Sequence, residues 1–264
     1  MDELFLSQDE ILAYITDFNH DSDHIYGYEK EEFGISPYIT FYIYHQEDEV
    51  EVVANKVIDI YEEFENEIID KSFKLRYRDT GVWKNSTKWK PSRKKMIEEM
   101  HESYKKYFVY FIAATTGDSD IQSPRWALQS NIRDDGSRYS SLKLSFGDKW
   151  VQENKNRWYT FVKECLIKLN PIQAYSGYEI GSTAQFPIIS PEFEIAERIF
   201  SNYFYGLDID HPGNMSHTHN NLDGYINSSA LGAGLRTPTW CFLLSPYWID
   251  QLGLSEEQIR LKLN

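Results

Sequence analysis

The stretch from Gly232 to Gly253 constrains the fold of this chain more tightly than any other part of its sequence. It places a flexible glycine turn before a rigid proline at 238, followed by a short apolar run that starts with Trp240. The Ser-Pro pair at 245–246 is typical of a helix start, and Gly253 is typical of a helix end. The stretch holds no acid/base pair and no set of metal ligands. We therefore expect it to serve as architecture, with Trp240 in a strand that packs into the core.

Strand and helix patterns alternate along the rest of the sequence. Residues 38–44 are β-branched and aromatic, which predicts a buried strand after a polar loop that ends at Pro37. Residues 73–78 alternate strictly, so we expect the apolar side chains to face inward and the basic ones, including Arg76, to lie on the opposite face. Further strands are predicted at 107–114, 126–132, 142–146, 175–180 and 184–189, and helices at 7–18, 47–68, 91–104, 156–169 and 190–203.

These elements predict an α/β (α+β) fold, with mixed, largely antiparallel sheets flanked by helices. The chain has 264 residues, of which 41% are hydrophobic, and this is ample for a folded core. It contains no linker rich in Pro, Gly or Ser. We therefore expect a single domain over residues 1–264, built as one compact body from two fused half-units at 1–150 and 151–264.

The composition argues against several classes of protein. The acidic N-terminus lacks the basic and apolar regions of a secretory signal, and no apolar run approaches the roughly 18 residues that cross a bilayer. Two cysteines, Cys165 and Cys241, do not make a disulfide framework, and Cys165 falls on the apolar face of its predicted helix. No phosphate-binding glycine loop, nucleophile elbow or zinc-protease helix motif is present. We expect a cytoplasmic, non-enzymatic protein with no cofactor, no metal and no membrane contact.

Charge is distributed very unevenly along the chain. Residues 1–70 hold 20 acidic and 2 basic residues, a net charge of −18, in a chain whose total is −14. Residues 71–150 hold 17 basic and 9 acidic residues, a net charge of +8. Phosphate would be repelled by the first block, so we expect no direct contact with nucleic acid. The acidic block is either a solvated surface or a surface that meets a basic partner protein.

The predicted helix at 47–68 displays the centre of this acidic block on a rigid element. Its apolar residues recur at spacings of three and four, which leaves an acidic outward face. If a partner binds this face, the expected contact residues are Glu47, Asp48, Glu51, Glu62, Glu63 and Glu65.

Histidines crowd in one further place, at His211, His217 and His219. His217 and His219, which have one residue between them, would lie on the same face of a strand. Asp208 or Asp210 could complete a set of metal ligands with them. This leaves a metal-dependent enzyme as an alternative function. The surrounding residues are loop formers, and neither cysteine is near in sequence, so a polar loop without metal is the simpler interpretation.

Four motifs resemble, in order and spacing, a bacterial family. They are Gly177-Tyr178, Tyr205-Gly206-Leu207-Asp208-Ile209-Asp210, Gly232-x-Gly234-Leu235-Arg236-Thr237-Pro238-Thr239-Trp240-x-x-x-Leu244, and Leu252-Gly253. The family, long described as a domain of unknown function, consists of type VI secretion immunity proteins against VRR-NUC-type nuclease effectors. The resemblance is concentrated in residues 170–264. The family usually has Leu-Gly-Gly at the last motif, where this chain has Leu254 in place of the second glycine.

The resemblance implies a non-catalytic protein that binds a toxic effector and blocks its nuclease site. A nuclease presents a basic surface to phosphates, so an acidic helix would attract that surface and exclude DNA. A homo-oligomer is compatible with the sequence. Besides immunity and the metal enzyme, the third interpretation is an acidic adaptor that binds another basic protein. The motif residues to which the resemblance gives structural roles are Gly177, Tyr178, Gly206, Asp208, Gly234, Arg236, Trp240 and Gly253.

Overall fold

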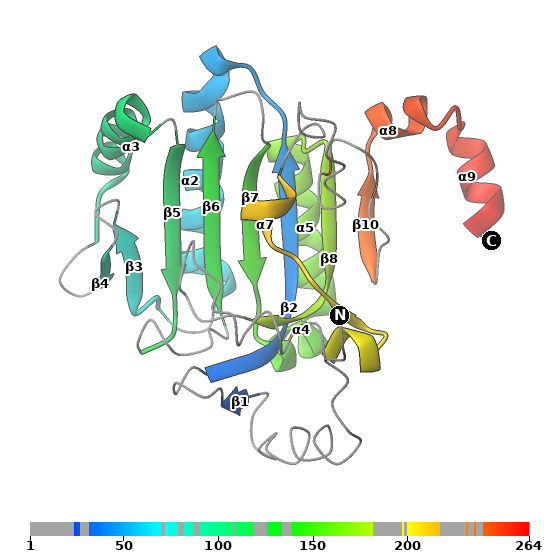
Figure 1. Cartoon of the computed structure of the whole chain (residues 1–264), viewed down its shortest axis with the longest axis horizontal. Coiled ribbons are helices and arrows are strands. Elements are labelled where there is room, and N and C mark those ends of the chain that lie inside the picture. Colours follow the sequence, from blue (N-terminus) through cyan, green and yellow to red (C-terminus); the bar gives the residue numbers. More distant parts are fainter. Residues whose placement is uncertain are drawn as a thin grey trace, which may run out of the picture.

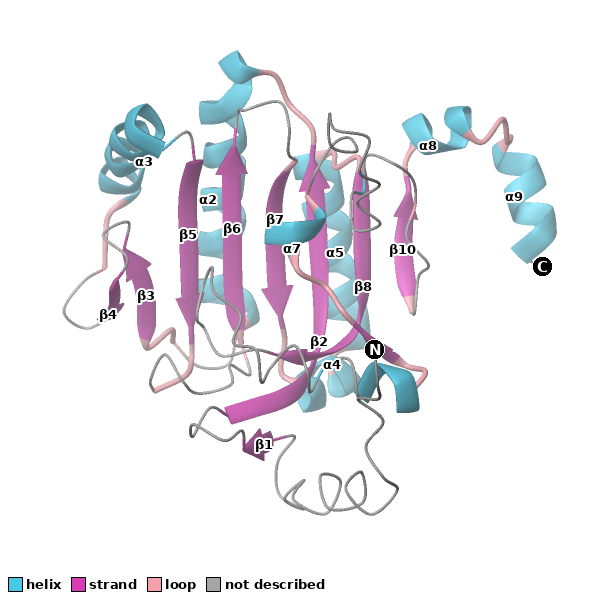
Figure 2. Ribbon diagram, in the orientation of Figure 1, coloured by secondary structure: helices cyan, strands magenta, loops and turns pink. Residues whose placement is uncertain are grey.

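A computed structural model of the chain describes residues 24–26, 32–69, 72–78, 82–86, 90–107, 109–118, 126–133, 139–181, 197, 200–216, 231, 235 and 240–263. The predicted helix at 7–18 and the predicted strand at 184–189 lie outside this part. The described strands form one continuous sheet, and helices α2 and α5 cross one side of it (Figures 1 and 2). Among the described residues, no helix combines the length and the hydropathy that a membrane span requires.

The sheet has the strand order β10-β8-β2-β7-β6-β5-β3-β4, with β1 paired to β2 and β9 paired to β8. The described pairings are antiparallel except that of β8 with β9, which is parallel. These findings confirm the predicted α/β class and its largely antiparallel character. The strands are β1 (His24–Tyr26), β2 (Glu32–Ile43), β3 (Leu75–Arg78), β4 (Val82–Asn85), β5 (Val109–Thr115), β6 (Ala127–Arg133), β7 (Ser140–Ser145), β8 (Gln173–Gly181), β9 (Leu207–Asp208) and β10 (Cys241–Leu244).

The helices lie where apolar residues recur at helical spacing, and α2 continues into a π-helical turn at Phe64–Ile68. Strand β2, from the first predicted half-unit, lies between β7 and β8, so both predicted half-units contribute strands to one sheet. The helices are α2 (Val50–Glu63), preceded by a 3-10 turn at Glu47–Glu49, α3 (Arg93–Tyr107), α4 (Asp148–Glu153), α5 (Lys155–Leu169), α7 (Pro212–Met215), α8 (Pro246–Gln251) and α9 (Glu256–Leu263).

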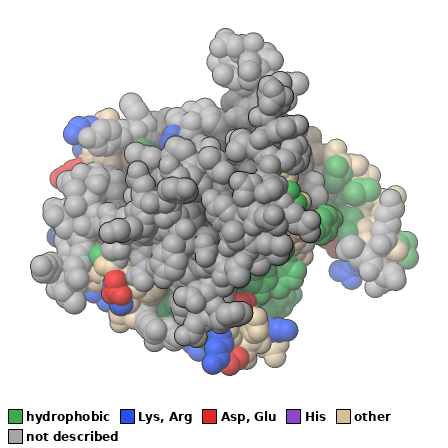
Figure 3. All heavy atoms as spheres, turned by 60° about the horizontal axis from the view of Figure 1, so that its bottom comes forward, with side chains coloured by type: hydrophobic (Ala, Val, Ile, Leu, Met, Phe, Trp, Pro, Cys, Tyr) green, Lys and Arg blue, Asp and Glu red, His purple; other side chains and the backbone are tan. Residues whose placement is uncertain are grey.

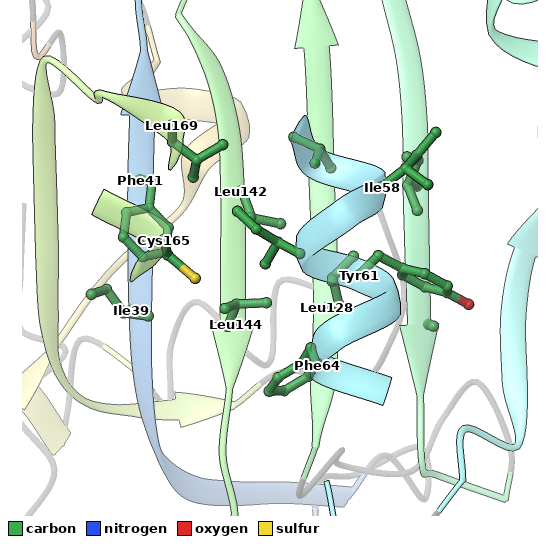
Figure 4. Packing of buried hydrophobic residues seen from close by; sticks show 14 of the residues in the cluster. Ile39, Phe41, Ile58, Tyr61, Phe64, Leu128, Leu142, Leu144, Cys165 and Leu169 are labelled. Atoms are coloured by element: carbon green, nitrogen blue, oxygen red, sulfur yellow. The ribbon is translucent and has the colours of Figure 1, made fainter. Parts of the chain in front are cut away.

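The main core lies between the sheet and the helices α2 and α5 (Figure 4). Phe64, the first residue of the π-helical turn after α2, is fully buried and stacks on Phe161 of α5 at a ring distance of 5.9 Å. Cys165 is buried in the same core, as its place on the apolar face of α5 predicts, and burial raises the pKa of its thiol. The prediction for this helix is confirmed, because the five residues expected on its apolar face are all buried: Trp158, Phe161, Val162, Cys165 and Leu169.

Strand β2 begins earlier than its sequence pattern predicts. The expected polar loop before Pro37 is wrong for residues 32–37, because residues 32–34 pair with β1 and residues 34–37 pair with β8. Proline is tolerated here because the ladder to β7 starts only at Tyr38, while the Pro37 carbonyl accepts a hydrogen bond from the Phe146 backbone N–H at 2.9 Å. The missing N–H of Pro37 therefore falls at the end of that ladder.

The opposite side of the sheet is polar and aromatic. Ile39, Phe41 and Ile43 of β2 point into the helical core, so the alternate residues Tyr38, Thr40 and Tyr42 point the other way. All three of these are fully buried. The segment that contains β9 and α7 covers part of this side, where α7 lies in front of β7 in Figure 1. This side of the sheet therefore contains a second, more polar interior.

The C-terminal pattern folds largely as predicted. Strand β10 follows Trp240, Ser245 occupies the position before α8, and Gly253 has a φ of +61°, which suits a glycine after a helix. Helix α9 starts with a reciprocal capping box: the Ser255 N–H donates to Gln258 Oε1 at 2.9 Å, and the Gln258 N–H donates to Ser255 Oγ at 3.2 Å.

Candidate partner-binding surface and buried charge network

The acidic helix α2 is faced by basic residues of this same chain. Arg93 of α3 donates to Asp59 Oδ1 at 2.5 Å and lies 3.4 Å from Glu62 Oε2. His101 of α3 lies 3.3 Å from Glu51, and Lys168 of α5 lies 3.2 Å from Glu63. The charge of this helix is therefore partly compensated within the fold.

Glu65 is the clearest case of an acidic residue with a structural role. Its carboxylate accepts a hydrogen bond from Arg76 Nη2, and both side chains are buried. The Arg76 guanidinium also lies over the rings of Tyr61 and Phe73, at 5.3 and 5.6 Å from their centroids. Burial lowers the pKa of Arg76 to about 10 and raises the pKa of Glu65. The expected outward position of Arg76 is wrong, because ion pairing with Glu65 holds it inside.

The predicted contact residues thus separate into an exposed group and a packed group. Asp48 is exposed, and the side chains of Glu51 and Glu62 are 54% and 47% exposed. Glu63 and Glu65 are packed against Lys168 and Arg76. The side chain of Glu47 lies outside the described residues. The exposed group remains available to a partner.

Two apolar side chains lie in the same short stretch as these acids. Tyr44, just after β2, is 56% exposed, and Val52, in the first turn of α2, is 53% exposed. We call Tyr44, Asp48, Glu51 and Val52 the α2 rim. A surface that combines acids with an aromatic residue offers both charge attraction and an apolar anchor to a basic protein.

The polar side of the sheet holds a buried charge network centred on Lys143 of β7. Lys143 Nζ donates to Glu179 Oε2 at 2.5 Å and to the backbone carbonyl of Asp210 at 2.7 Å. It also lies 3.7 Å from Asp210 Oδ2 and 5.1 Å from the centroid of the Tyr38 ring. These contacts tie β7 and β8 to the segment that follows β9.

Two aspartates of the motif at 205–210, Asp208 and Asp210, contact β2. Tyr38 OH donates to Asp208 Oδ2 at 2.5 Å. Thr40 Oγ1 donates to Asp210 Oδ2 at 2.5 Å, and Tyr42 OH donates to Asp210 Oδ1 at 3.0 Å. Asp208 and Asp210 thus hold the segment around β9 against β2.

His211 points to a different partner from the two aspartates. Its Nε2 lies 2.5 Å from Glu197 Oε2, and Glu197 is buried. In the described part of the chain, no group of three or more His, Cys, Asp or Glu residues is arranged to hold a metal ion. His217 and His219 lie outside the described residues. The described contacts of Asp208, Asp210 and His211 thus hold the segment after β9 against its neighbours in the fold.

Burial and mutual attraction set the protonation of the network. Burial raises the pKa of Glu179 to about 8, against the opposing effect of Lys143. Burial alone would lower the pKa of Lys143, but the carboxylates of Glu179 and Asp210 together raise it above its usual value. The pKa of Glu197 is also raised by burial. A lysine whose pKa is raised is a poor base and nucleophile, so these contacts fit a clamp between strands better than a catalytic group.

The described residues among the other motif positions lie in β8, just before β9 and after α8. Tyr178 OH donates to Asp148 Oδ1 at 2.8 Å, and burial raises the pKa of Tyr178 to about 12. Gly177 pairs with Tyr38 across β8 and β2, and Gly206 precedes β9. Gly234 and Arg236 lie outside the described residues.

Trp240 differs from its predicted place in the core. It is 51% exposed, although its ring stacks on Trp158 at 5.6 Å and lies 5.7 Å from the Tyr178 ring. The reason is that β10 is an edge strand, so a side chain at its start is covered from one side. Trp240 fastens this edge to α5 and is not part of the central core.

The charge network was not anticipated from the sequence. Its members come from β2, β7, β8 and the segment after β9, and Lys143 and Asp210 are 67 positions apart in the chain. Residues 142–146 alternate between apolar and polar positions, which places Lys143 on the polar face of β7, and the structure buries this face. A lysine that is buried in this way needs a buried acceptor or counter-charge for its ammonium group.

The comparisons with known proteins concern the fold. Neither a protein-family model nor a curated protein matches the chain. Its structure is similar to that of the Pseudomonas aeruginosa T6SS protein PA0821, with a TM-score of 0.62 and 14% sequence identity. The likeness covers 80% of this chain and 60% of that protein, so this chain matches less than two thirds of its length. At this identity the comparison shows a shared fold.

Proposed function

We propose that this chain is an immunity protein that binds and neutralises a toxic nuclease effector of a bacterial type VI secretion or related contact-dependent toxin system. The observation that supports the proposal most is the likeness of fold, over 80% of this chain, to a protein that bears the name of the type VI secretion system. The motifs between residues 170 and 264, which resemble an immunity family, support the same function.

The acidic surface supplies the mechanism of binding. Asp48, Glu51 and Glu62 lie exposed on or beside α2, within a block of 70 residues whose net charge is −18. A nuclease needs a basic surface for phosphate, so opposite charges accelerate the encounter and favour this partner over others. Tyr44 and Val52 of the α2 rim provide apolar contact area beside the charges.

Inhibition follows from occlusion. A protein that covers the basic surface of a nuclease with carboxylates removes the site to which DNA phosphates would bind. Glu63 and Glu65 hold the helix in place through Lys168 and Arg76, so they support the surface without being part of it. The proposed contact is therefore narrower than the six residues that the sequence indicates.

Survival of cells tests the proposed function. The effector that co-purifies with this chain from the native cell would be expressed from an inducible promoter, with and without this chain. We expect the chain to restore growth and to leave the chromosomal DNA intact. The matched control is an effector with an inactivated nuclease site, which should leave growth unaffected in both strains. Equal killing with and without the folded chain would contradict the proposal.

A further inference from the structure

Two exposed tyrosines lie at the edge of the sheet where β2 ends. Tyr44 directly follows β2, and Tyr247 lies in the first turn of α8, which follows β10. Strands β2 and β10 both pair antiparallel with β8, so they run in the same direction and end at the same edge (Figure 1). Tyr44 is 56% exposed and Tyr247 is 51% exposed. We call Tyr44 and Tyr247 the edge tyrosines.

A third tyrosine, Tyr139, lies beside both edge tyrosines. It is buried just before β7, which starts at the same edge because β7 runs antiparallel to β2. The ring of Tyr44 meets the ring of Tyr139 at 6.3 Å between centroids and an angle of 80°. Burial raises the pKa of Tyr139 to about 12, and Tyr247 and Tyr44 add to the increase. The two exposed rings therefore flank one buried ring.

Hydrogen bonds fix the turn that carries Tyr44. The Gln46 N–H donates to Glu49 Oε2 at 2.9 Å, and the Glu49 N–H donates to the Gln46 carbonyl at 3.0 Å. His45 Nε2 lies 2.7 Å from Ser140 Oγ, at the start of β7. Because this turn is already ordered, a partner that binds Tyr44 loses little free energy to ordering the backbone around it.

The two segments that carry the edge tyrosines are acidic. Residues 44–51 contain four carboxylates and no lysine or arginine, and residues 245–252 contain Asp250 as their only charged residue. Asp48 and Glu51 of the α2 rim are exposed, as is Asp250. Figure 3 brings the opposite end of the sheet forward and shows basic as well as acidic side chains there among the described residues. The edge with the tyrosines therefore favours a cationic partner.

An arginine of this same chain shows which cation suits tyrosines and carboxylates together. The Arg76 guanidinium lies over the rings of Tyr61 and Phe73 and pairs with Glu65. A guanidinium stacks on aromatic faces and binds a carboxylate through two parallel hydrogen bonds, whereas the ammonium of lysine acts as a point charge. The edge tyrosines and their neighbouring acids offer the same two kinds of contact to an arginine from another protein.

We propose that the edge tyrosines, together with Asp48 and Glu51 of the α2 rim, form a surface that binds arginine side chains of a partner protein. The partner is the basic nuclease of the proposed function, on which this inference rests, and its arginines would otherwise contact phosphate. The contact then extends from the α2 rim across the edge of the sheet to α8. Stacking on tyrosine adds selectivity to charge attraction, because a lysine-rich surface of equal charge binds less well.

Two peptides of equal charge, hexa-arginine and hexa-lysine, test this chemistry without the nuclease. Fluorescence anisotropy would measure their binding to the full-length chain at low ionic strength. We expect the arginine peptide to bind about fivefold more tightly than the lysine peptide. The edge variant, Tyr44→Leu with Tyr247→Leu, keeps an apolar surface but should lose this preference. The control variant, Tyr159→Leu with Tyr203→Leu, changes two exposed tyrosines outside this edge and should keep it.

The purified effector that co-purifies with this chain separates this inference from the proposed function. We expect the edge variant to bind the effector about tenfold more weakly than the wild type, with the control variant unchanged. Equal binding of the effector by wild type and edge variant, or equal binding of both peptides by the wild type, would overturn the arginine surface alone. An effector that does not bind the wild type contradicts the proposed function, and the peptides still decide on the arginine surface.

Sedimentation of the chain alone addresses a second copy as the occupant of this surface. We expect the wild type and the edge variant to sediment alike. A dimer of the wild type that the edge variant abolishes would assign the surface to a second copy and overturn the inference.

Discussion

Lys143 and Glu179 form an ion pair inside the protein, with 2.5 Å between Nζ and Oε2. Lys143 lies on β7 and Glu179 on β8, and β2 separates the two strands in the sheet. The pair therefore spans a strand, and the Lys143 bond to the Asp210 carbonyl adds the segment after β9. Three parts of the chain that are distant in sequence are held together at this point.

Replacement of Lys143 should show how much this buried network contributes to the stability of the fold. Above pH 8, where Glu179 is ionised, we expect Lys143→Met to lower the free energy of unfolding by about 3–5 kcal/mol, because the carboxylates of Glu179 and Asp210 lose their buried counter-charge. Urea unfolding measures this difference. Lys149→Met, at an exposed lysine, serves as the control and should change stability by less than about 0.5 kcal/mol. Equal midpoints for both variants would show that the network does not stabilise the fold.

The same network predicts a pH dependence. Burial raises the pKa of Glu179 from 4.5 to about 8, so the folded state holds this proton more tightly than the unfolded state. The stability that this group contributes is present below pH 4.5 and is lost as the pH rises to about 8. The charged groups that face it are Lys143, Asp210 and Glu197. Unfolding midpoints measured over this range should fall for the wild type relative to Glu179→Gln, and parallel pH profiles would contradict the assignment.

Glu65 should behave as a structural residue, in contrast to the exposed acids of α2. We expect Glu65→Ala to destabilise the protein by about 3–5 kcal/mol, because Arg76 is left charged and buried without its partner. Glu62→Ala, at a half-exposed side chain, should cost less than about 1 kcal/mol. Thermal unfolding of the two variants measures the difference. Similar melting temperatures would mean that Arg76 finds another partner or reaches water.

Trp240 should hold the edge of the sheet and not the whole fold. We expect Trp240→Ala to cost about 1–2 kcal/mol, since the ring is half exposed but stacks on Trp158 and Tyr178. Hydrogen exchange should show faster exchange in β10, with β5, β6 and β7 unchanged. Cooperative loss of protection in all strands would instead place Trp240 in the central core, as the sequence pattern suggested.

Local patterns predicted most of the secondary structure. The apolar spacing of α5 identified its five buried residues, and the strand patterns at 126–132 and 142–146 predicted β6 and β7, which pair antiparallel. Both signals act between neighbours in sequence. The start of β2 was missed because a proline usually interrupts a strand, and only the position of the β7 ladder makes Pro37 acceptable.

Contacts between residues that are distant in the sequence were harder to predict. Arg76 alternates with apolar residues and so was expected on the face opposite to them, but its partner Glu65 lies in the π-helical turn at the end of α2. Strand alternation alone gives no sign of such a partner. The division of the acidic residues into exposed and packed ones likewise depends on where α3 and α5 place Arg93 and Lys168. The sequence identified the acidic helix but not which of its carboxylates remain exposed.

Inhibition of the effector by this chain tests the proposed immunity function. Cleavage of DNA by the purified effector that co-purifies with this chain would be measured with increasing amounts of the chain. We expect complete inhibition near equimolar amounts, and slower association for the triple variant Asp48→Lys, Glu51→Lys, Glu62→Lys. The control Glu153→Lys, Glu164→Lys, Asp250→Lys changes the net charge equally at other exposed positions and should inhibit like the wild type. Undiminished cleavage in the presence of excess folded wild-type chain would contradict the account.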